Sequence, residues 1–179
     1  MFRLLIVINF ILINNVWSET VMLDDFSAKN QLQWTYISDQ VMGGVSEGKL
    51  ALLQDEQGAY AKLSGQVSTQ NNGGFIQFRT DLKNIDKGFQ GIYAKVKGNE
   101  QQYFIHLRTR GTLLPWQYYQ SGFTAGEEWK IIKLPMNSFM PSSKWLKKTI
   151  GSSSIRSIGL VAFGRDHSAN LEVSEIGFY

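Results

Sequence analysis

The chain has 179 residues, of which 43% are hydrophobic and 18% charged, with no cysteine and a formal net charge of +3. The absence of cysteine excludes disulfides, thiolate nucleophiles and thiolate metal sites. No basic run is longer than Lys147-Lys148, so a nucleic-acid surface has little electrostatic support and we expect no nucleic-acid partner.

The first segment has the pattern of a signal peptide. Arg3 is followed by an apolar run over residues 4–13 and then by the small residue Ser18, which is the order found before a secretory cleavage site. The run is too short to cross a bilayer comfortably, and an uncleaved membrane anchor is the alternative. We expect residues 1–18 to be removed near Ser18, leaving residues 19–179 as one exported, periplasmic domain. Peripheral association with a membrane stays open, without a spanning segment after cleavage.

Alternation of apolar and polar residues dominates the remaining chain. Period two, with turn residues about every eight to twelve positions, is typical of half-buried strands. The clearest strands are predicted over residues 76–82, 92–97 and 102–108, and others over residues 34–38, 49–53, 60–66, 116–123, 129–134, 155–163 and 171–179. About ten short strands without crossover helices predict an all-β fold, an antiparallel β-sandwich of jelly-roll type.

Two glycine-pair turns stand out among the connections. They read Asp39-Gln40-Val41-Met42-Gly43-Gly44-Val45-Ser46 and Asn71-Asn72-Gly73-Gly74-Phe75. Glycine, asparagine and aspartate tolerate positive φ, so both segments can turn sharply. A binding loop would use Asp39, Met42, Gly43, Gly44, Ser46, Asn71, Asn72, Gly73 and Gly74. The structural alternative is that Asp39 and Ser46 satisfy local backbone donors, and that the Asn71 and Asn72 amides cap the strand at Phe75.

A second candidate site follows from strand alternation. Phe104, His106 and Arg108 share one face of a predicted strand, and Trp116, Tyr118 and Gln120 share one face of a strand that can pair with it. Together they would form a groove of aromatic and polar groups that suits sugars or peptides, with Arg108, Trp116 and Tyr118 as the main contacts. The alternative places Trp116 and Tyr118 in the core and makes Arg108 an exposed cation on its strand.

Catalytic patterns are weak. His106 and His167 are the two histidines, and neither has a second histidine at metal-ligand spacing. Gly44-Val45-Ser46-Glu47-Gly48 has the Gly-x-Ser-x-Gly spacing, but no helix is predicted after it, and a nucleophile elbow requires a turn from a strand into a helix. We therefore expect no catalytic residue, no metal and no cofactor, with a hydrolase as the residual enzyme hypothesis.

The motifs resemble those of the complex I intermediate-associated protein 30 family. The matching residues are Trp34, 39–46, 71–75, 103–108, 116–120, Phe123, Trp129, Leu134-Pro135, Phe139 and 155–160. The resemblance implies a galactose-binding-like β-sandwich, and it implies a role like that of the mitochondrial members, which assemble respiratory complex I. Our first functional hypothesis is therefore a non-catalytic factor that binds a protein client in assembly or folding. A carbohydrate-binding module of the cell envelope is the second hypothesis, and an enzyme is the third.

Overall fold

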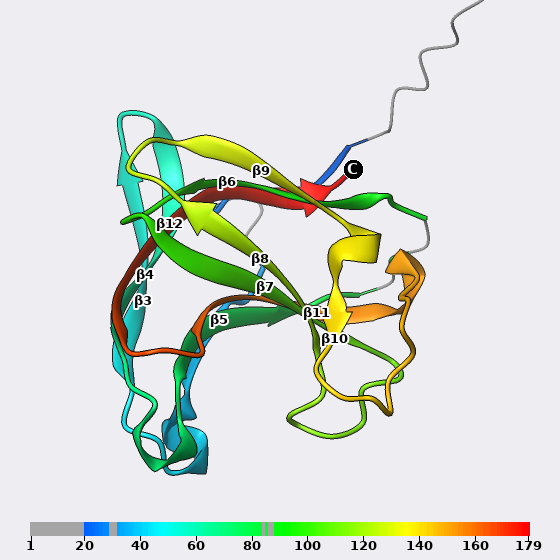
Figure 1. The fold of residues 1–179 in the computed structure, drawn as a ribbon. Helices are drawn as coiled ribbons and strands as arrows, with labels where there is room; N and C mark the ends of the chain where they lie inside the picture. The colour runs from blue at the N-terminus through cyan, green and yellow to red at the C-terminus, as the bar shows by residue number, and fades with distance from the viewer. Residues whose placement is uncertain (1–19, 29–31, 84, 86–87) are drawn as a thin grey trace, which may run out of the picture.

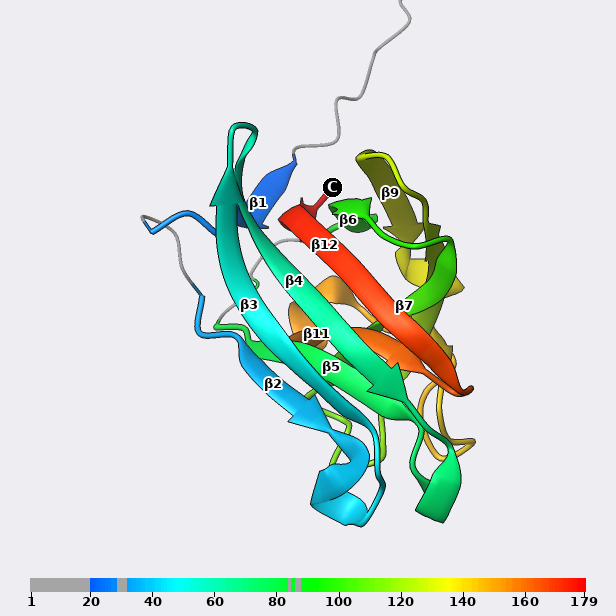
Figure 2. The ribbon, with the colours of Figure 1, turned by 90° about the vertical axis from the view of Figure 1, so that its left-hand side faces the viewer.

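Two antiparallel β-sheets pack face to face in this computed structural model, which describes residues 20–28, 32–83, 85 and 88–179. The predicted signal peptide and its cleavage site lie outside the described residues. Sheet A contains, in spatial order, β3 (Glu47–Asp55), β4 (Gly58–Val67), β12 (His167–Phe178), β6 (Gly91–Lys97) and β9 (Lys130–Pro135), with β1 (Val21–Asp24) beside β12. Figure 2 looks onto this sheet.

Sheet B is the second layer (Figure 1). Its strands are, in spatial order, β10 (Met140–Pro141), β8 (Tyr119–Ala125), β7 (Gln101–Thr109), β11 (Ile155–Phe163), β5 (Phe75–Asp81) and β2 (Thr35–Ser38). Four short 3-10 turns occur in the described chain: η1 (Asp39–Met42), η2 (Gln70–Asn72), η3 (Met136–Ser138) and η4 (Ser152–Ser154). The predicted all-β antiparallel sandwich is confirmed.

The core lies between the two sheets and follows from the alternation in sequence. In β7, Tyr103, Ile105 and Leu107 are fully buried, whereas the residues between them point away from sheet A. Their partners across the interface include Leu63, Leu171 and other apolar residues of β4 and β12. Full burial of one such side chain contributes about 2–3 kcal/mol to folding.

Every predicted strand is present in the structure, but several boundaries differ and two additional strands occur. β8 begins at Tyr119, not at Trp116, because residues 114–117 form a turn in which Gln117 N donates to Leu114 O at 3.0 Å. The short strands β1 and β10 were not predicted, because segments of four and two residues are too short to show a reliable alternation.

The connections gather at the two ends of sheet B. The register pairs Phe75 with Phe163 at one end, and Asp81 with Ser157 towards the other. The loops that follow β2 and β4 meet at the first end, at the bottom of Figures 1 and 2. The loop after β7 lies at the second end, because β7 pairs Thr109 with Ile155.

Candidate functional site

Asp39 joins the two glycine-pair loops. Its buried carboxylate accepts hydrogen bonds from Ser46 N at 2.9 Å, Ser46 Oγ at 2.5 Å, Gly74 N at 2.5 Å and Phe75 N at 3.2 Å. Burial alone would raise the pKa of this carboxyl, but the hydrogen bonds from Gly74, Ser46 and Phe75 outweigh it and hold the pKa below its usual range. Asp39 and Ser46 thus use their polar atoms inside the protein, as the structural alternative proposed.

The glycines explain why these motifs contain pairs. Gly43 (φ 90°) and Gly74 (φ 125°) have the left-handed backbone that side chains rarely adopt. At Gly44 and Gly73 the requirement is space, since a Cβ on either residue would overlap the Asp39 carboxylate. Each pair therefore supplies one residue for the turn and one for the close approach of Asp39. We call Asp39, Ser46 and the two glycine pairs the Asp39 latch.

The tips of the latch loops face solvent. Met42 is 58% exposed, and Asn71 and Asn72 are exposed with positive φ. The Asn71 and Asn72 amides were predicted to cap the strand at Phe75. Asp39 does this instead, because its carboxylate accepts hydrogen bonds from Gly74 N and Phe75 N. The sequence could not show this, since Asp39 is 35 residues away from Gly74.

The outer face of sheet B, which points away from sheet A, brings together a larger set of chemically active side chains. Across β5, β11 and β7, Arg79 lies opposite Gly159, and Gly159 lies opposite His106. The next row towards the second end consists of Asp81, Ser157 and Arg108. The prediction that Phe104, His106 and Arg108 share one strand face is confirmed by the alternating burial of β7.

Four rings form an aromatic platform on this face: Phe104, His106, Tyr118 and Phe163. The rings of His106 and Tyr118 stack with centroids 4.1 Å apart and planes inclined by 10°. Phe163 packs edge-on against His106 at 5.6 Å and against Phe104 at 6.0 Å. Tyr118 therefore lies flat over His106 and is held by neighbours from β7 and β11, an arrangement that fixes an aromatic surface.

His106 is neutral at physiological pH. Burial of the ring lowers its pKa to about 4, although the side chain of Gln120 acts in the opposite direction. A neutral imidazole can stack on Tyr118 without the cost of burying a charge.

This pKa predicts a pH dependence of stability. The unfolded chain binds a proton on His106 near pH 6.5, so between about pH 4 and 6.5 it holds more protons than the folded chain. The free energy of unfolding should therefore rise with pH across this window, by up to about 3 kcal/mol, and be unaffected by His106 above it. Urea denaturation at several pH values should show that the free energy of unfolding rises less steeply with pH in His106→Gln than in the wild type. An equally steep rise in the two proteins would contradict the lowered pKa of His106.

Beside the platform, three arginines surround a shallow groove. One hollow of about 50 Å³ is lined by residues including Gln77, Arg79, His106, Arg108 and Tyr118. An adjoining hollow of about 140 Å³ is lined by Arg79, Asp81, Arg108, Thr112, Arg156 and Ser157. Burial, Arg79 and Arg156 all lower the pKa of Arg108, and Asp81 opposes them. We call the two hollows together the arginine groove.

The loop after β7 closes one side of this groove and is well anchored. Arg108 Nη2 donates to Leu114 O at 3.0 Å. The Gln117 side-chain oxygen accepts from the backbone N–H groups of Leu113 and Leu114, at 2.9 and 3.1 Å. Trp116 stands on this loop with 60% of its surface exposed, so it belongs neither to the core nor to the strand face of Tyr118.

Exposed apolar side chains extend from this loop to its neighbour. The two loops are tied together by Ser142, whose Oγ donates to Trp116 O at 3.1 Å and accepts from Tyr118 N at 3.0 Å. Large exposed side chains on them, which we call the apolar rim, are Leu113, Leu114, Trp116, Met140 and Trp145. Such a group of apolar residues on a surface is typical of an interaction site.

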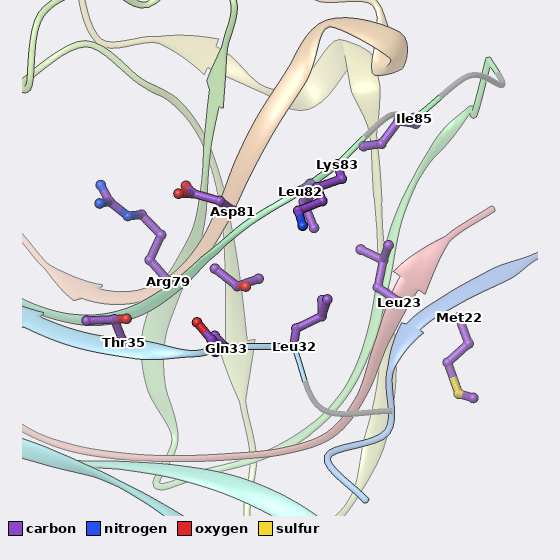
Figure 3. Close-up of a pocket in the computed structure, with 11 residues that line it drawn as sticks. Met22, Leu23, Leu32, Gln33, Thr35, Arg79, Asp81, Leu82, Lys83 and Ile85 are labelled. Atoms are coloured by element: carbon purple, nitrogen blue, oxygen red, sulfur yellow. The ribbon is translucent and has the colours of Figure 1, made fainter. Parts of the chain in front are cut away.

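A wider pocket of about 720 Å³ lies where β1 meets the ends of β2 and β5 (Figure 3). Arg79 and Asp81 are on one side of it, and Leu23, Leu32 and Ile85 are on the other. Three of its lining residues, Leu32, Lys83 and Ile85, stand next in the sequence to residues outside the described ranges, so we do not base a site on this pocket.

Within the described ranges, no group of three His, Asp or Glu side chains is placed to hold a metal ion. In the same ranges no helix is long and apolar enough to span a membrane.

Comparison with known proteins decides the family. The model of the complex I intermediate-associated protein 30 (CIA30) family matches residues 24–173. The chain belongs to this family. Among curated proteins no match was found.

Solved structures resemble this CIA30 protein in fold. The family 11 carbohydrate-binding module of the Clostridium thermocellum cellulase Lic26A-Cel5E superposes with a TM-score of 0.72 at 20% identity, covering 90% of this chain and 95% of the module. The same type of module with a bound β-1,3-1,4-mixed-linked tetrasaccharide gives 0.70 at 20% identity, covering 89% and 94%. The family 30 module of C. thermocellum Cel9D-Cel44B gives 0.60 at 13% identity, covering 90% and 97%. These likenesses establish the sandwich fold.

Several members of the candidate site were not found by sequence reasoning. Arg79, Asp81, Arg156 and Phe163 come from β5 and β11, whose placement beside β7 depends on long-range pairing. Arg79 and Asp81 are two positions apart in the predicted strand over residues 76–82, so alternation places both charges on one face of it. The strands that would lie beside this face could not be predicted.

Proposed function

We propose that this CIA30 protein is a non-catalytic binding domain that holds a glycan chain on the outer face of sheet B. The observation that carries the proposal is the flat stack of Tyr118 on His106 beside Arg108 and Arg79. The proposal places the protein outside the cytoplasm, as the predicted signal peptide suggests.

The chemistry of a sugar matches this face. A pyranose ring has apolar C–H faces that pack on an aromatic ring, and hydroxyl groups at its edge that need hydrogen-bond partners. Tyr118 supplies the ring, and Gln77, Arg79 and Arg108 line the same hollow with polar groups. Because Tyr118 is supported by His106 and Phe163, little side-chain entropy is lost when a ligand binds.

The comparisons and the lining residues support a binding role. The similar structures named above are carbohydrate-binding modules, and one of them carries a bound tetrasaccharide. Among the described residues that line the hollow beside Tyr118, none is a carboxylate that could act as a general acid or base. Fold alone does not determine function, so the weight of the proposal falls on Tyr118 and its neighbours.

Isothermal titration against a panel of soluble oligosaccharides, neutral and acidic, tests the proposal. We expect at least one glycan to bind, and Tyr118→Ala to weaken that binding about tenfold, since an aromatic contact together with the apolar area it buries is worth about 1–2 kcal/mol. Tyr60→Ala is the matched control, because Tyr60 pairs with Trp129 on sheet A. Absence of binding by every glycan, or equal effects of the two variants, would contradict the proposal.

A protein client is the second candidate ligand, and the apolar rim favours it. Trp145 and Leu113 are 85% and 81% exposed, and side chains of this kind are usual in protein interfaces. The family is named for association with complex I intermediates, which suggests a role in assembly.

Cross-linking in the native cell envelope distinguishes this candidate. If a client binds the rim, respiratory-complex subunits should be captured by the wild type and by Tyr118→Ala, but not by a Leu113→Ser/Trp145→Ser variant. Capture that is unaffected by the rim substitutions would remove the apolar rim as the client site.

A further inference from the structure

The arginine groove contains more positive charge than its surroundings neutralise. Arg79, Arg108 and Arg156 line it, and Asp81 is the one carboxylate among its described lining residues. None of the three arginines forms an ion pair with a described carboxylate. Like charges at close range repel each other, so this cluster lowers the stability of the free protein.

Arg108 is the most constrained of the three. Its Nη2 is held by Leu114 O, while its Nε is buried without a hydrogen-bond partner. A buried donor that lacks an acceptor is costly, and a guanidinium edge with a free N–H is suited to a planar oxyanion. Arg108 therefore combines a hydrogen-bond donor that the described protein leaves unsatisfied with a charge that no described carboxylate pairs with.

The floor of the groove is made of small residues of β11. Ser157 lies between Asp81 and Arg108, and Gly159 lies between Arg79 and His106. A Cβ at Gly159 would come within 3.1 Å of Gln77 Oε1 and 3.6 Å of Arg79 Cβ. A side chain at this position would crowd the space between the arginines, so the absence of one keeps the groove open.

The arginine groove and the aromatic platform are continuous. Arg108 lines both hollows, and Tyr118 lines the first of them together with Arg79. A ligand that places a ring on Tyr118 therefore brings its substituents to the guanidinium groups.

We propose that the glycan bound by this face is acidic, with uronic acid units whose carboxylates occupy the arginine groove. This inference rests on the proposed glycan-binding function and specifies its ligand. A uronate combines a pyranose ring for Tyr118 with a carboxylate that Arg108 and Arg79 can bind by charge-assisted hydrogen bonds. A neutral glucan would leave the repulsion among the three arginines unrelieved.

The test compares acidic oligosaccharides with their neutral counterparts by isothermal titration. The probes are oligogalacturonate and oligo-β-1,4-glucuronate, each paired with the chain obtained by reducing its carboxyl groups to primary alcohols. We expect at least one acidic probe to bind about tenfold more tightly than its neutral counterpart, and the difference to shrink as salt is raised from about 0.05 to 0.5 M.

Charge variants test whether the arginine groove causes the tighter binding of acidic chains. Arg79→Gln and Arg108→Gln should each weaken acidic binding about fivefold or more, whereas Asp81→Asn should strengthen it several-fold, which a misfolded variant could not do. Lys49→Gln removes the same charge from an exposed position of β3 in sheet A and should have no effect.

A failure of the acidic-ligand proposal can be told apart from a failure of the glycan-binding proposal. Equal affinity for acidic and neutral chains, with Tyr118→Ala still disruptive, would overturn the acidic ligand and leave the glycan-binding function in place. Unchanged affinity in both arginine variants would also overturn it. Absence of binding by acidic and neutral chains alike would overturn both proposals.

Discussion

Replacing Asp39 by alanine should lower the free energy of unfolding by about 4 kcal/mol, a large fraction of the stability of a domain of this size. The substitution removes a buried carboxylate that receives N–H groups from Ser46, Gly74 and Phe75. Those donors come from the loops that follow β2 and β4, so the loops lose their shared acceptor and stay joined only through weaker contacts such as the hydrogen bonds between Ser46 and Ser68.

Urea denaturation at neutral pH measures this effect, with Asp55→Ala as the control. Asp55 is exposed and receives a single N–H group from Gln57, so its removal should hardly move the midpoint. Because the folded pKa of Asp39 lies below its unfolded value, the stability it contributes is present above about pH 4 and is lost on further acidification. A midpoint for Asp39→Ala equal to that of Asp55→Ala would contradict the latch.

Replacing Gly44 by alanine should cost about 3 kcal/mol, although Gly44 does not have positive φ. The new methyl group would overlap the Asp39 carboxylate, which is fixed by its hydrogen bonds and cannot move aside cheaply. At Gly43 the cost has a different cause. Its φ of 90° disfavours a side chain, but nothing lies within 4 Å of the Cβ that Gly43→Ala would add. That variant should lose only about 1 kcal/mol.

A double-mutant cycle gives the decisive comparison for Gly44. In an Asp39→Ala background the carboxylate is gone, so adding Gly44→Ala should cost much less than it does in the wild type. Additive losses would show that Gly44 is required for a reason other than the approach of Asp39.

Sequence alternation predicted most of the fold because period two directly reports which side of a strand is buried. The face shared by Phe104, His106 and Arg108 was predicted for this reason. The two turn motifs were also recognisable, but their purpose was not. The hydrogen bond from Gly74 N to Asp39 links residues 35 positions apart, and only the folded chain brings them together.

The candidate site was only partly predictable because it crosses several strands. Its arginines come from β5, β7 and β11, which are neighbours in space in an order that differs from their order in sequence. Trp116 shows a different failure. The sequence continues the alternation of β8 back through Tyr118 to Trp116, but the Gln117 side chain bonds to Leu113 N and Leu114 N and turns the loop away.

Backbone amide chemical-shift mapping tests the central claim most directly, that the outer face of sheet B is the ligand-binding surface of this CIA30 protein. The isotope-labelled protein would be titrated with the oligosaccharide that binds most tightly in the panel. We expect the largest shifts in β5, β7 and β11 around Arg79, Arg108 and Gly159, and in the loop from residue 113 to Tyr118. Shifts confined to sheet A or to the loops of the Asp39 latch would contradict the claim.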